Sequence, residues 1–320
     1  MMKRKIYVAV FCFSGIFFSC ENLTKSPENE PIPAKNDGWT PLSVRTDMNV
    51  SLLPATRGTI TTVPDTAKIG TFISGDKTLN KPYNGQLYKN ILLTKGAGNA
   101  WDLAAPVYLS ATERAWVFAY YPYNAANNDG TTIPIEAGSQ TDYLYGVSAS
   151  YATATNPVAV IRLKHALAVL KFRIYKEPEV PFSPVLTRIC FVENPLNMFG
   201  YGNGKLNIET GKVTIDQMPP KVDVETKAMN LTITETIPTN EVEYPELLVM
   251  PMNEATATDG EIGLVLYISG THYVCKFPAG TKFESGKKYT YIIKLTAKTL
   301  SVKFYDVADW TDEKTENIDI

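Results

Sequence analysis

Short apolar runs broken by turn-forming residues extend along most of this chain, and they limit its fold more than any other feature. Many of these runs alternate apolar and polar residues, a period of two that is typical of half-buried β-strands. Residues 206–215 carry two such runs on either side of E-T-G-K, a sequence suited to a hairpin connection. The 20 Gly and 21 Pro residues are spread between the runs, so the sequence predicts an all-β protein of the sandwich class.

The expected strands follow one another with hardly any helix between them. Residues 166–174 are the most ambiguous, because their apolar run also fits a helix, but V-L-K-F-R-I favours a strand. We expect strands at residues 42–52, 68–73, 86–94, 115–121, 143–147, 158–175, 185–192, 204–208, 212–215, 229–234, 246–250, 261–268, 272–277, 288–294 and 299–304.

The length of 320 residues indicates two domains and is ample for burying a core. We place the boundary near Asn156 and Pro157, with the proline-rich residues 177–184 as the alternative. Residues 58–157 would then form an N-terminal β-sandwich domain, and residues 158–320 a C-terminal one.

Residues 1–19 are typical of a lipoprotein export signal. A basic start, M-M-K-R-K, precedes an apolar stretch at residues 6–18, which is shorter than the ~20 residues that span a bilayer. Cleavage before Cys20 would leave bulky Phe17 at position −3, which suits lipoprotein signal peptidase rather than the ordinary signal peptidase. We therefore expect Cys20 to carry diacylglycerol and to anchor an exported protein to the membrane. A plain secretory signal with an incidental Cys20 is the alternative.

A tether and a propeptide strand are expected in residues 20–57. Residues 20–38 are polar, carry prolines and lack periodicity, as in a flexible tether. Residues 42–52 alternate apolar and polar side chains, as in a half-buried strand. They are followed by P-A-T-R-G, an exposed-looking segment whose Arg57 suits proteolysis.

Charge and cysteine usage exclude two classes of protein. Loss of Lys3, Arg4 and Lys5 with the signal lowers the net charge from −2 to −5, so no basic field exists to hold nucleic acid. Cys190 and Cys275 lie in apolar runs, and two buried free thiols are favoured over a disulfide. The chain is therefore no disulfide scaffold.

Motifs for catalysis or for cofactor binding are not found. The two histidines, His165 and His272, lie in no nucleophile motif, so structural roles are favoured. No C-x-x-C or histidine cluster supports a metal site. The glycine-rich residues 200–204 continue into an expected strand rather than a helix, so they lack the helix N-terminus that binds phosphate. We expect no enzyme, with no catalytic residue, no cofactor and no metal.

Aromatic residues gather in A-W-V-F-A-Y-Y-P-Y at residues 115–123. If exposed, they could stack against sugar rings, but a core strand with Trp116, Phe118 and Tyr120 on one face is favoured. One alternative function follows from this region: a non-polymerising surface lipoprotein that binds a glycan or a host ligand.

Cys20, the strand at residues 42–52 and Arg57 together suggest how the protein is processed. Cleavage after Arg57 would release the lipid anchor and the first strand together. A sandwich without that strand has unpaired backbone groups and open apolar pockets. A strand of a neighbouring subunit would fill them by β-augmentation, and repeated head-to-tail contacts of this kind build a filament.

In their order along the chain, several motifs resemble the fimbrillin family of Bacteroidetes, which comprises type V pilin subunits. The resemblance covers essentially the whole chain. The matching motifs are F-F-S-C at residues 17–20, A-T-R-G at 55–58, A-Y-Y-P-Y at 119–123, L-K-H-A-L-A-V-L at 163–170, P-A-G at 278–280, K-K-Y-T-Y-I at 287–292, and residues 300–310 up to Trp310.

The resemblance implies two transthyretin-like β-sandwich domains in tandem and a lipid-anchored precursor at the outer membrane or cell surface. It implies cleavage by an arginine-specific surface protease between Arg57 and Gly58, with Arg45 as a lesser candidate. It further implies polymerisation with other pilin subunits, of the same or another kind, into a fimbrium for adhesion. The family's donor strand is C-terminal, here residues 307–320. Because residues 311–317 are strongly polar, a tip or accessory position, or a strand that completes its own domain, is the alternative.

Overall fold

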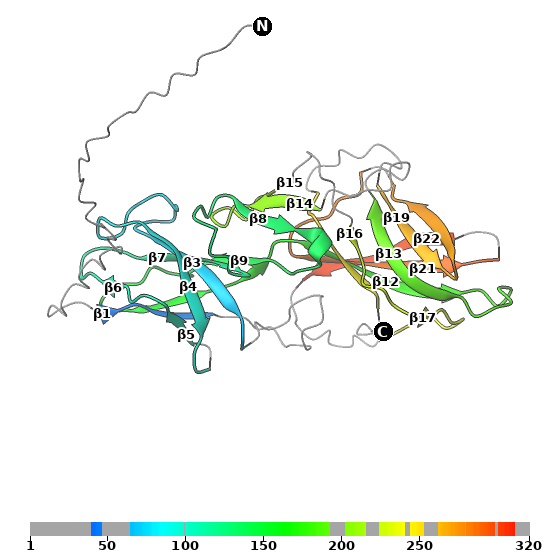
Figure 1. The fold of residues 1–320 in the computed structure, drawn as a ribbon, viewed down its shortest axis with the longest axis horizontal. Helices are drawn as coiled ribbons and strands as arrows, with labels where there is room; N and C mark the ends of the chain where they lie inside the picture. The colour runs from blue at the N-terminus through cyan, green and yellow to red at the C-terminus, as the bar shows by residue number, and fades with distance from the viewer. Residues whose placement is uncertain are drawn as a thin grey trace, which may run out of the picture. The chain divides into compact units, whose positions relative to one another are not determined.

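The computed structural model describes residues 40–46, 65–98, 100–192, 202–215, 224–240, 244–252, 262–278, 280–297 and 300–310 (Figure 1). These residues form β-strands joined by turns, and the helical element η1 (Ala137–Ser139) is a single short 3-10 turn. The all-β fold class predicted from the sequence is confirmed, whereas the transthyretin-like detail stays a prediction.

The first part of the chain forms an eight-stranded sheet. Its pairing is antiparallel except between the first two strands of the order, β10 and β2, which run parallel. The order across the sheet is β10 (Val158–Ile161), β2 (Ser43–Thr46), β5 (Ala100–Leu103), β4 (Tyr88–Lys95), β3 (Lys68–Ser74), β7 (Trp116–Tyr121), β9 (Leu144–Val147) and β11 (Lys164–His165).

The central strands of this sheet are buried on both faces. Ile69 and Val117 belong to one apolar cluster, while Phe72 and Phe118 belong to another on the opposite face. Burial on both faces explains why β7 is almost continuously apolar in the sequence. The second cluster also receives side chains from a three-stranded sheet made of β15 (Val213–Ile215), β14 (Asn203–Leu206) and β8 (Ile133–Glu136).

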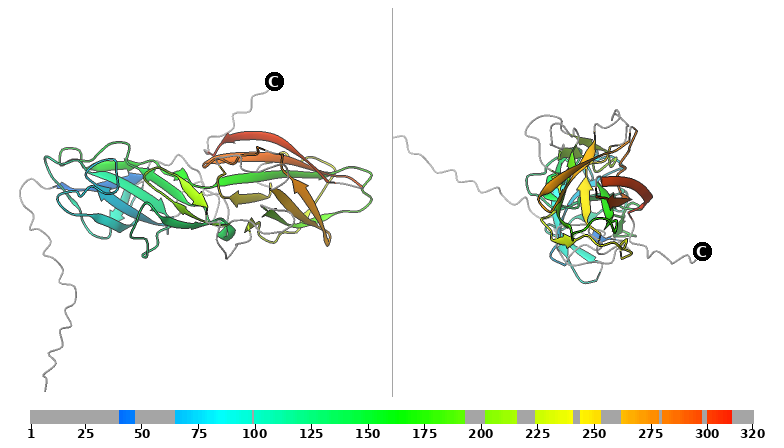
Figure 2. Two further views of the ribbon diagram at one scale, coloured as in Figure 1. Left: turned by 90° about the horizontal axis from the view of Figure 1, so that it is seen from above. Right: turned by 90° about the vertical axis from the view of Figure 1, so that its right-hand side faces the viewer.

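The later part of the chain forms two further sheets (Figure 2). Side chains of both sheets contribute to the same cluster. In one, β12 is parallel to β21, and β22 forms an edge beside β21. The four-stranded sheet has the order β18 (Glu246–Val249), β12 (Ala168–Lys176), β21 (Lys287–Leu295) and β22 (Leu300–Asp309). The five-stranded sheet has the order β16 (Val224–Glu225), β13 (Val185–Val192), β19 (Gly263–Ile268) and β20 (Thr271–Lys276), with β17 (Leu231–Thr232) also paired to β13.

Several strand predictions are confirmed. The ambiguous residues 166–174 are largely in the strand β12, and β14 and β15 form the predicted hairpin. The single strand expected at residues 158–175 is wrong, because these residues are divided among β10, β11 and β12. Three short strands were not predicted: β5 and β8, which are four residues long, and β6 (Tyr108–Leu109), which pairs with β1 (Thr40–Pro41). Strands this short carry too few alternating positions for a pattern to be seen.

The division into two domains stays a prediction. β10 and β11, which follow the expected boundary at Pro157, both pair within the eight-stranded sheet. The strands on either side of that boundary thus share a sheet, and the next strand, β12, begins the four-stranded one.

One prediction concerns the close approach of β3 and β7. A Cβ atom added at Gly70 would lie 2.0 Å from Cε1 of Tyr120, whose ring is fully buried and whose hydroxyl donates a hydrogen bond to Asn90. Gly70→Ala should therefore lower the free energy of unfolding by about 2 kcal/mol, measured by urea denaturation. Lys68→Ala, at the exposed first position of the same strand, should change it by less than about 0.5 kcal/mol. Equal stability of the two variants would contradict this packing.

Candidate strand-exchange site

The first described strand lies inside the eight-stranded sheet rather than at its edge. β2 pairs in parallel with β10 over all four of its residues, and in antiparallel fashion with β5 through Val44 and Arg45. Just before it, the backbone N–H of Leu42 donates to the carbonyl of Val107 at 2.8 Å. In Figure 1 this segment is dark blue and runs beside β5. Its backbone is thus hydrogen-bonded on both sides.

The side chains of this segment alternate between the core and solvent. Leu42, Val44 and Thr46 are 5%, 0% and 5% exposed, whereas Arg45 is exposed. The alternation confirms the half-buried pattern predicted for this part of the strand, while its continuation through residues 47–52 lies outside the described residues. The segment packs in an apolar cluster that also holds Trp101, Val107, Leu109, Ala159 and Ile161.

A buried hydrogen bond adds specificity to the packing. The indole N–H of Trp101 donates to the hydroxyl of Thr46 at 2.8 Å, and Trp101 is 3% exposed. Leaving such a donor buried without an acceptor costs about 1–3 kcal/mol. This contact of Trp101 was not predicted, because β5 is short and no local pattern connects it with Thr46. We refer to the position of residues 42–46 between β5 and β10 as the strand slot.

An empty strand slot would combine unpaired backbone groups with open apolar pockets. Without residues 42–46, the facing edges of β5 and β10 would present unpaired N–H and C=O groups, which are costly when buried. Pockets lined by Trp101 and Ile161 would open beside them. An incoming strand with apolar side chains two residues apart would satisfy both the backbone and the pockets.

Of the predicted processing residues, Arg45 alone lies in the described part of the chain. Cys20, Arg57 and Gly58 lie outside the described residues. Arg45, the lesser cleavage candidate, lies in β2 between two paired neighbours. Because a protease must take hold of an extended, unpaired backbone, this pairing makes Arg45 a poor substrate in the folded protein.

The C-terminal strand pairs within its own sheet. Val307 pairs with Tyr289, and Asp309 with Lys287, so β22 extends five residues beyond the expected end at residue 304. Of the predicted donor segment, residues 307–310 are therefore held in the fold, and residues 311–320 lie outside the described residues. Phe304 is 50% exposed at this edge of the sheet.

Trp310 holds the end of β22 against the eight-stranded sheet. Its indole is stacked on the ring of His165, with centroids 3.6 Å apart and an angle of 6° between the planes. Nδ1 of His165 lies 2.8 Å from a carboxylate oxygen of Asp142, and all three side chains are buried. The structural role predicted for His165 is consistent with these contacts.

The aromatic segment is mainly core, as predicted. Phe118 and Tyr120 are fully buried, whereas Trp116, Tyr121 and Tyr123 are half-buried. Trp116 therefore departs from the expectation that it shares the buried face with the other two. Only part of the segment is open to a ligand.

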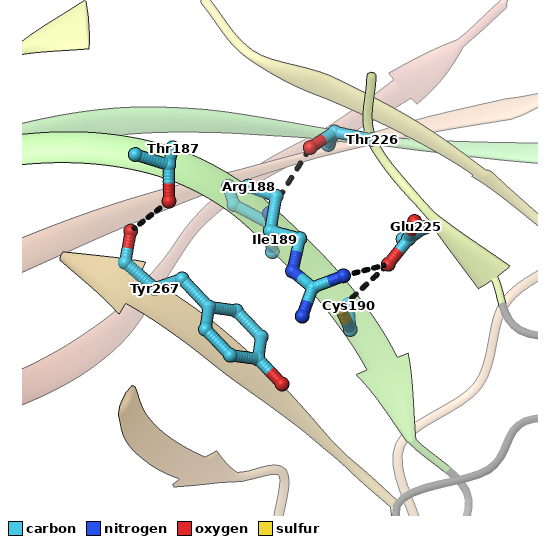
Figure 3. Close-up of polar contacts among 7 residues, drawn as sticks. All are labelled: Thr187, Arg188, Ile189, Cys190, Glu225, Thr226 and Tyr267. Atoms are coloured by element: carbon cyan, nitrogen blue, oxygen red, sulfur yellow. Dashed lines mark hydrogen bonds and ion pairs between the residues drawn. The ribbon is translucent and has the colours of Figure 1, made fainter. Parts of the chain in front are cut away.

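The two thiols are free, as predicted, but their surroundings differ. Cys275 is buried, and burial raises the pKa of its thiol to about 12. Cys190 is half-buried instead of buried: its thiol donates to Glu225 at 3.3 Å, beside the ion pair of Glu225 with Arg188 (Figure 3). The guanidinium of Arg188 also lies 4.0 Å from the ring centroid of Tyr267. These contacts place Cys190 in a polar network rather than in the core.

Two further observations apply to the described part of the chain alone. No helix there is long and apolar enough to cross a membrane. Nor do three or more His, Cys, Asp and Glu side chains gather there in a way that could hold a metal ion. The expectation of no catalytic, cofactor or metal site stays a prediction.

Comparison with known proteins identifies the family. The profile of the fimbrillin-like family matches residues 56–310. A search of curated proteins finds no match.

Solved structures share the fold over most of the chain. One is a protein provisionally assigned to cell adhesion from Bacteroides uniformis, with a TM-score of 0.59 and 18% identity, covering 86% of this chain and 100% of that one. A second of the same description, from Bacteroides ovatus, has a TM-score of 0.59 and 15% identity over 86% and 99% of the two chains. A fimbrial protein from Bacteroides vulgatus has a TM-score of 0.52 and 11% identity over 85% and 99%. With a family profile that covers most of its length, this chain belongs to the fimbrillin-like family.

Proposed function

We propose that this protein is a structural and adhesive fimbrial subunit that is cut after Arg57 and polymerises by donor-strand exchange at the cell surface. The observation that carries the proposal is the position of residues 42–46 in the interior of a sheet, N-terminal to Arg57. Family membership and the fimbrial and adhesion proteins of the same fold support a structural, non-enzymatic role.

Export as a lipoprotein is the first step of this proposal. Lipoprotein signal peptidase would cut before Cys20, and the acylated cysteine would hold the precursor at the outer membrane. Residues 20–38 would keep the folded part away from the bilayer. While residues 42–46 occupy the strand slot, the precursor has no vacancy to fill and stays monomeric.

Cleavage at Arg57 is the activating step. An arginine-specific surface protease cutting between Arg57 and Gly58 would separate residues 42–46 covalently from the rest of the fold. A cut at Arg45 would leave part of the first strand attached, and Arg45 is paired in β2. The cleaved strand could then leave the slot or be displaced.

The proposed donor is the C-terminal segment of another subunit, residues 307–320. Ile318 and Ile320 are two residues apart, as are Leu42 and Val44, so they could fill two adjacent pockets of the slot. Residues 307–309 are paired to β21, so their donation would require that pairing to break. Since donor and slot are different surfaces, the contact is head-to-tail and yields a filament.

The position of this subunit in a fimbrium depends on how well its residues 307–320 can fill the strand slot of another subunit. Residues 311–317 are strongly polar, so a short inserted stretch, or a tip or accessory position, is the alternative to a repeating stalk subunit.

We also propose that the boundary between tandem domains lies after β11, because β10 and β11 pair in the first sheet.

The cleavage step predicts a sharp difference between two arginine variants. A chain that begins after Cys20 should be cut by an arginine-specific protease at Arg57 and should then form filaments. N-terminal sequencing locates the cut, and electron microscopy detects the filaments. Arg57→Ala should stay a monomer, because its first strand remains attached. Arg45→Ala is the matched control and should assemble like the unchanged chain. Filament formation by Arg57→Ala would refute the mechanism, and a clean cut at Arg57 without assembly would favour an anchored or tip subunit.

Trp101 should report whether the strand slot is filled. In the precursor its indole is buried against Thr46, so quenching by acrylamide should be weak. After cleavage and removal of the first strand, quenching of Trp101 should rise several-fold, and it should fall again on assembly. Subtracting the signal of the Trp101→Phe variant isolates this residue from the other tryptophans. A quenching constant that stays the same throughout would contradict the exchange of strands.

A further inference from the structure

Four side chains on the first sheet and its loops form a cluster of alternating cations and aromatic rings. The ammonium of Lys77 lies 4.7 Å from the ring centroid of Trp116, and the guanidinium of Arg114 lies 4.6 Å from that of Tyr151. The two rings meet edge to face, with centroids 5.9 Å apart. Trp116 is half-buried, and the other three side chains are exposed. We call these four residues the cation–aromatic cluster.

Backbone pairing fixes the positions of the two rings. Trp116 begins β7 and pairs with Ser74 at the end of β3, so the turn that follows β3 is held beside the indole. An antiparallel bridge between Ala115 and Ala152 brings Tyr151 to the start of the same strand. The cluster is therefore built on the rigid sheet, although its parts are far apart in sequence.

The two cations of the cluster have no carboxylate partner among the residues that the structure describes. Within the described residues, neither Lys77 nor Arg114 forms an ion pair. The nearest carboxylates in sequence are used locally: Asp76 accepts two hydrogen bonds from a threonine two residues later, at 2.7 and 2.8 Å. Glu113 accepts one from the backbone N–H of Asn84 at 2.7 Å. Positive charge beside one exposed and one half-buried aromatic ring is thus available to a ligand.

We infer that the cation–aromatic cluster binds an acidic sugar. Aromatic rings pack against the C–H faces of sugar rings, and a guanidinium binds a carboxylate through paired hydrogen bonds. A carboxylate held by Arg114 would place the sugar ring against Tyr151, and Lys77 would receive a second acidic group of a longer chain. Uronic acids and sialic acids both supply this combination of a carboxylate and an apolar ring face.

Two other ligand classes fit less well. β7 lies between β3 and β9 in the sheet, so it has no free edge on which an acidic peptide could add a strand. Nucleic acid would need a wide basic surface, whereas the chain has a net charge of −2. A short acidic glycan needs only the few charges that the cluster offers.

The test measures glycan binding by titration calorimetry with the folded chain that begins after Cys20. The probes are sialyllactose against lactose, and an oligogalacturonate against its methyl ester. We expect at least one acid to bind about tenfold tighter than its neutral counterpart. The acid that binds shows whether the ligand is a sialic acid or a uronic acid. Arg114→Gln, Lys77→Gln and Tyr151→Ala should each weaken binding about tenfold.

Matched controls separate this site from a general effect of charge. Lys164→Gln and Phe182→Ala change an exposed cation and a 51% exposed aromatic residue outside the cluster, and both should bind like the unchanged chain. The Arg57→Ala precursor should also bind, because no residue of the cluster belongs to β2, β5 or β10; binding thus succeeds or fails independently of strand exchange. Equal affinity for acid and neutral sugar, no binding of either acid, or equal losses in the controls would overturn the inference.

Discussion

The structure depends on a strand, β2, that is paired on both sides within a sheet although it lies near the N-terminal end of the chain. β2 supplies hydrogen bonds to β10 on one side and β5 on the other, and Val44 is completely buried between them. Removal of an edge strand would expose one row of backbone groups. Removal of β2 would expose two rows, because it separates β10 from β5 and the rest of the sheet. Loss of β2 therefore leaves backbone groups unpaired on both β5 and β10 and exposes apolar side chains. An empty slot for this reason strongly favours binding of any strand that fits it.

A second set of contacts ties the later strands to the first sheet. Trp310 is stacked on His165, which is paired with Asp142, so the end of β22 meets the edge strand β11. The side-chain amide of Gln140 donates to the carbonyl of Leu248 and accepts from its N–H, which caps the outer edge of β18. One edge of the four-stranded sheet is thereby protected, whereas β22 at the other edge carries exposed aromatic side chains.

Local pattern was sufficient for much of this fold and insufficient for the site. The alternation through Leu42 and Val44 indicated a half-buried strand, but the parallel pairing with residues 158–161 joins segments over a hundred residues apart and leaves no local signal. The contact of Trp101 with Thr46 was not predicted, because β5 is too short to show a period. Cys190 was expected in the core because its neighbours are apolar, yet it lies beside Glu225 and Arg188. The cation–aromatic cluster likewise joins residues from separate segments, which only the sheet brings together.

The most direct test of the account is a density map of the assembled fibre, by cryo-electron microscopy at a resolution that distinguishes side chains. Donor-strand exchange predicts continuous density for a strand of another copy between β5 and β10, with side chains that point toward Trp101 and Ile161. Density in that position that connects to the subunit's own N-terminal segment, or a slot without any strand, would contradict it.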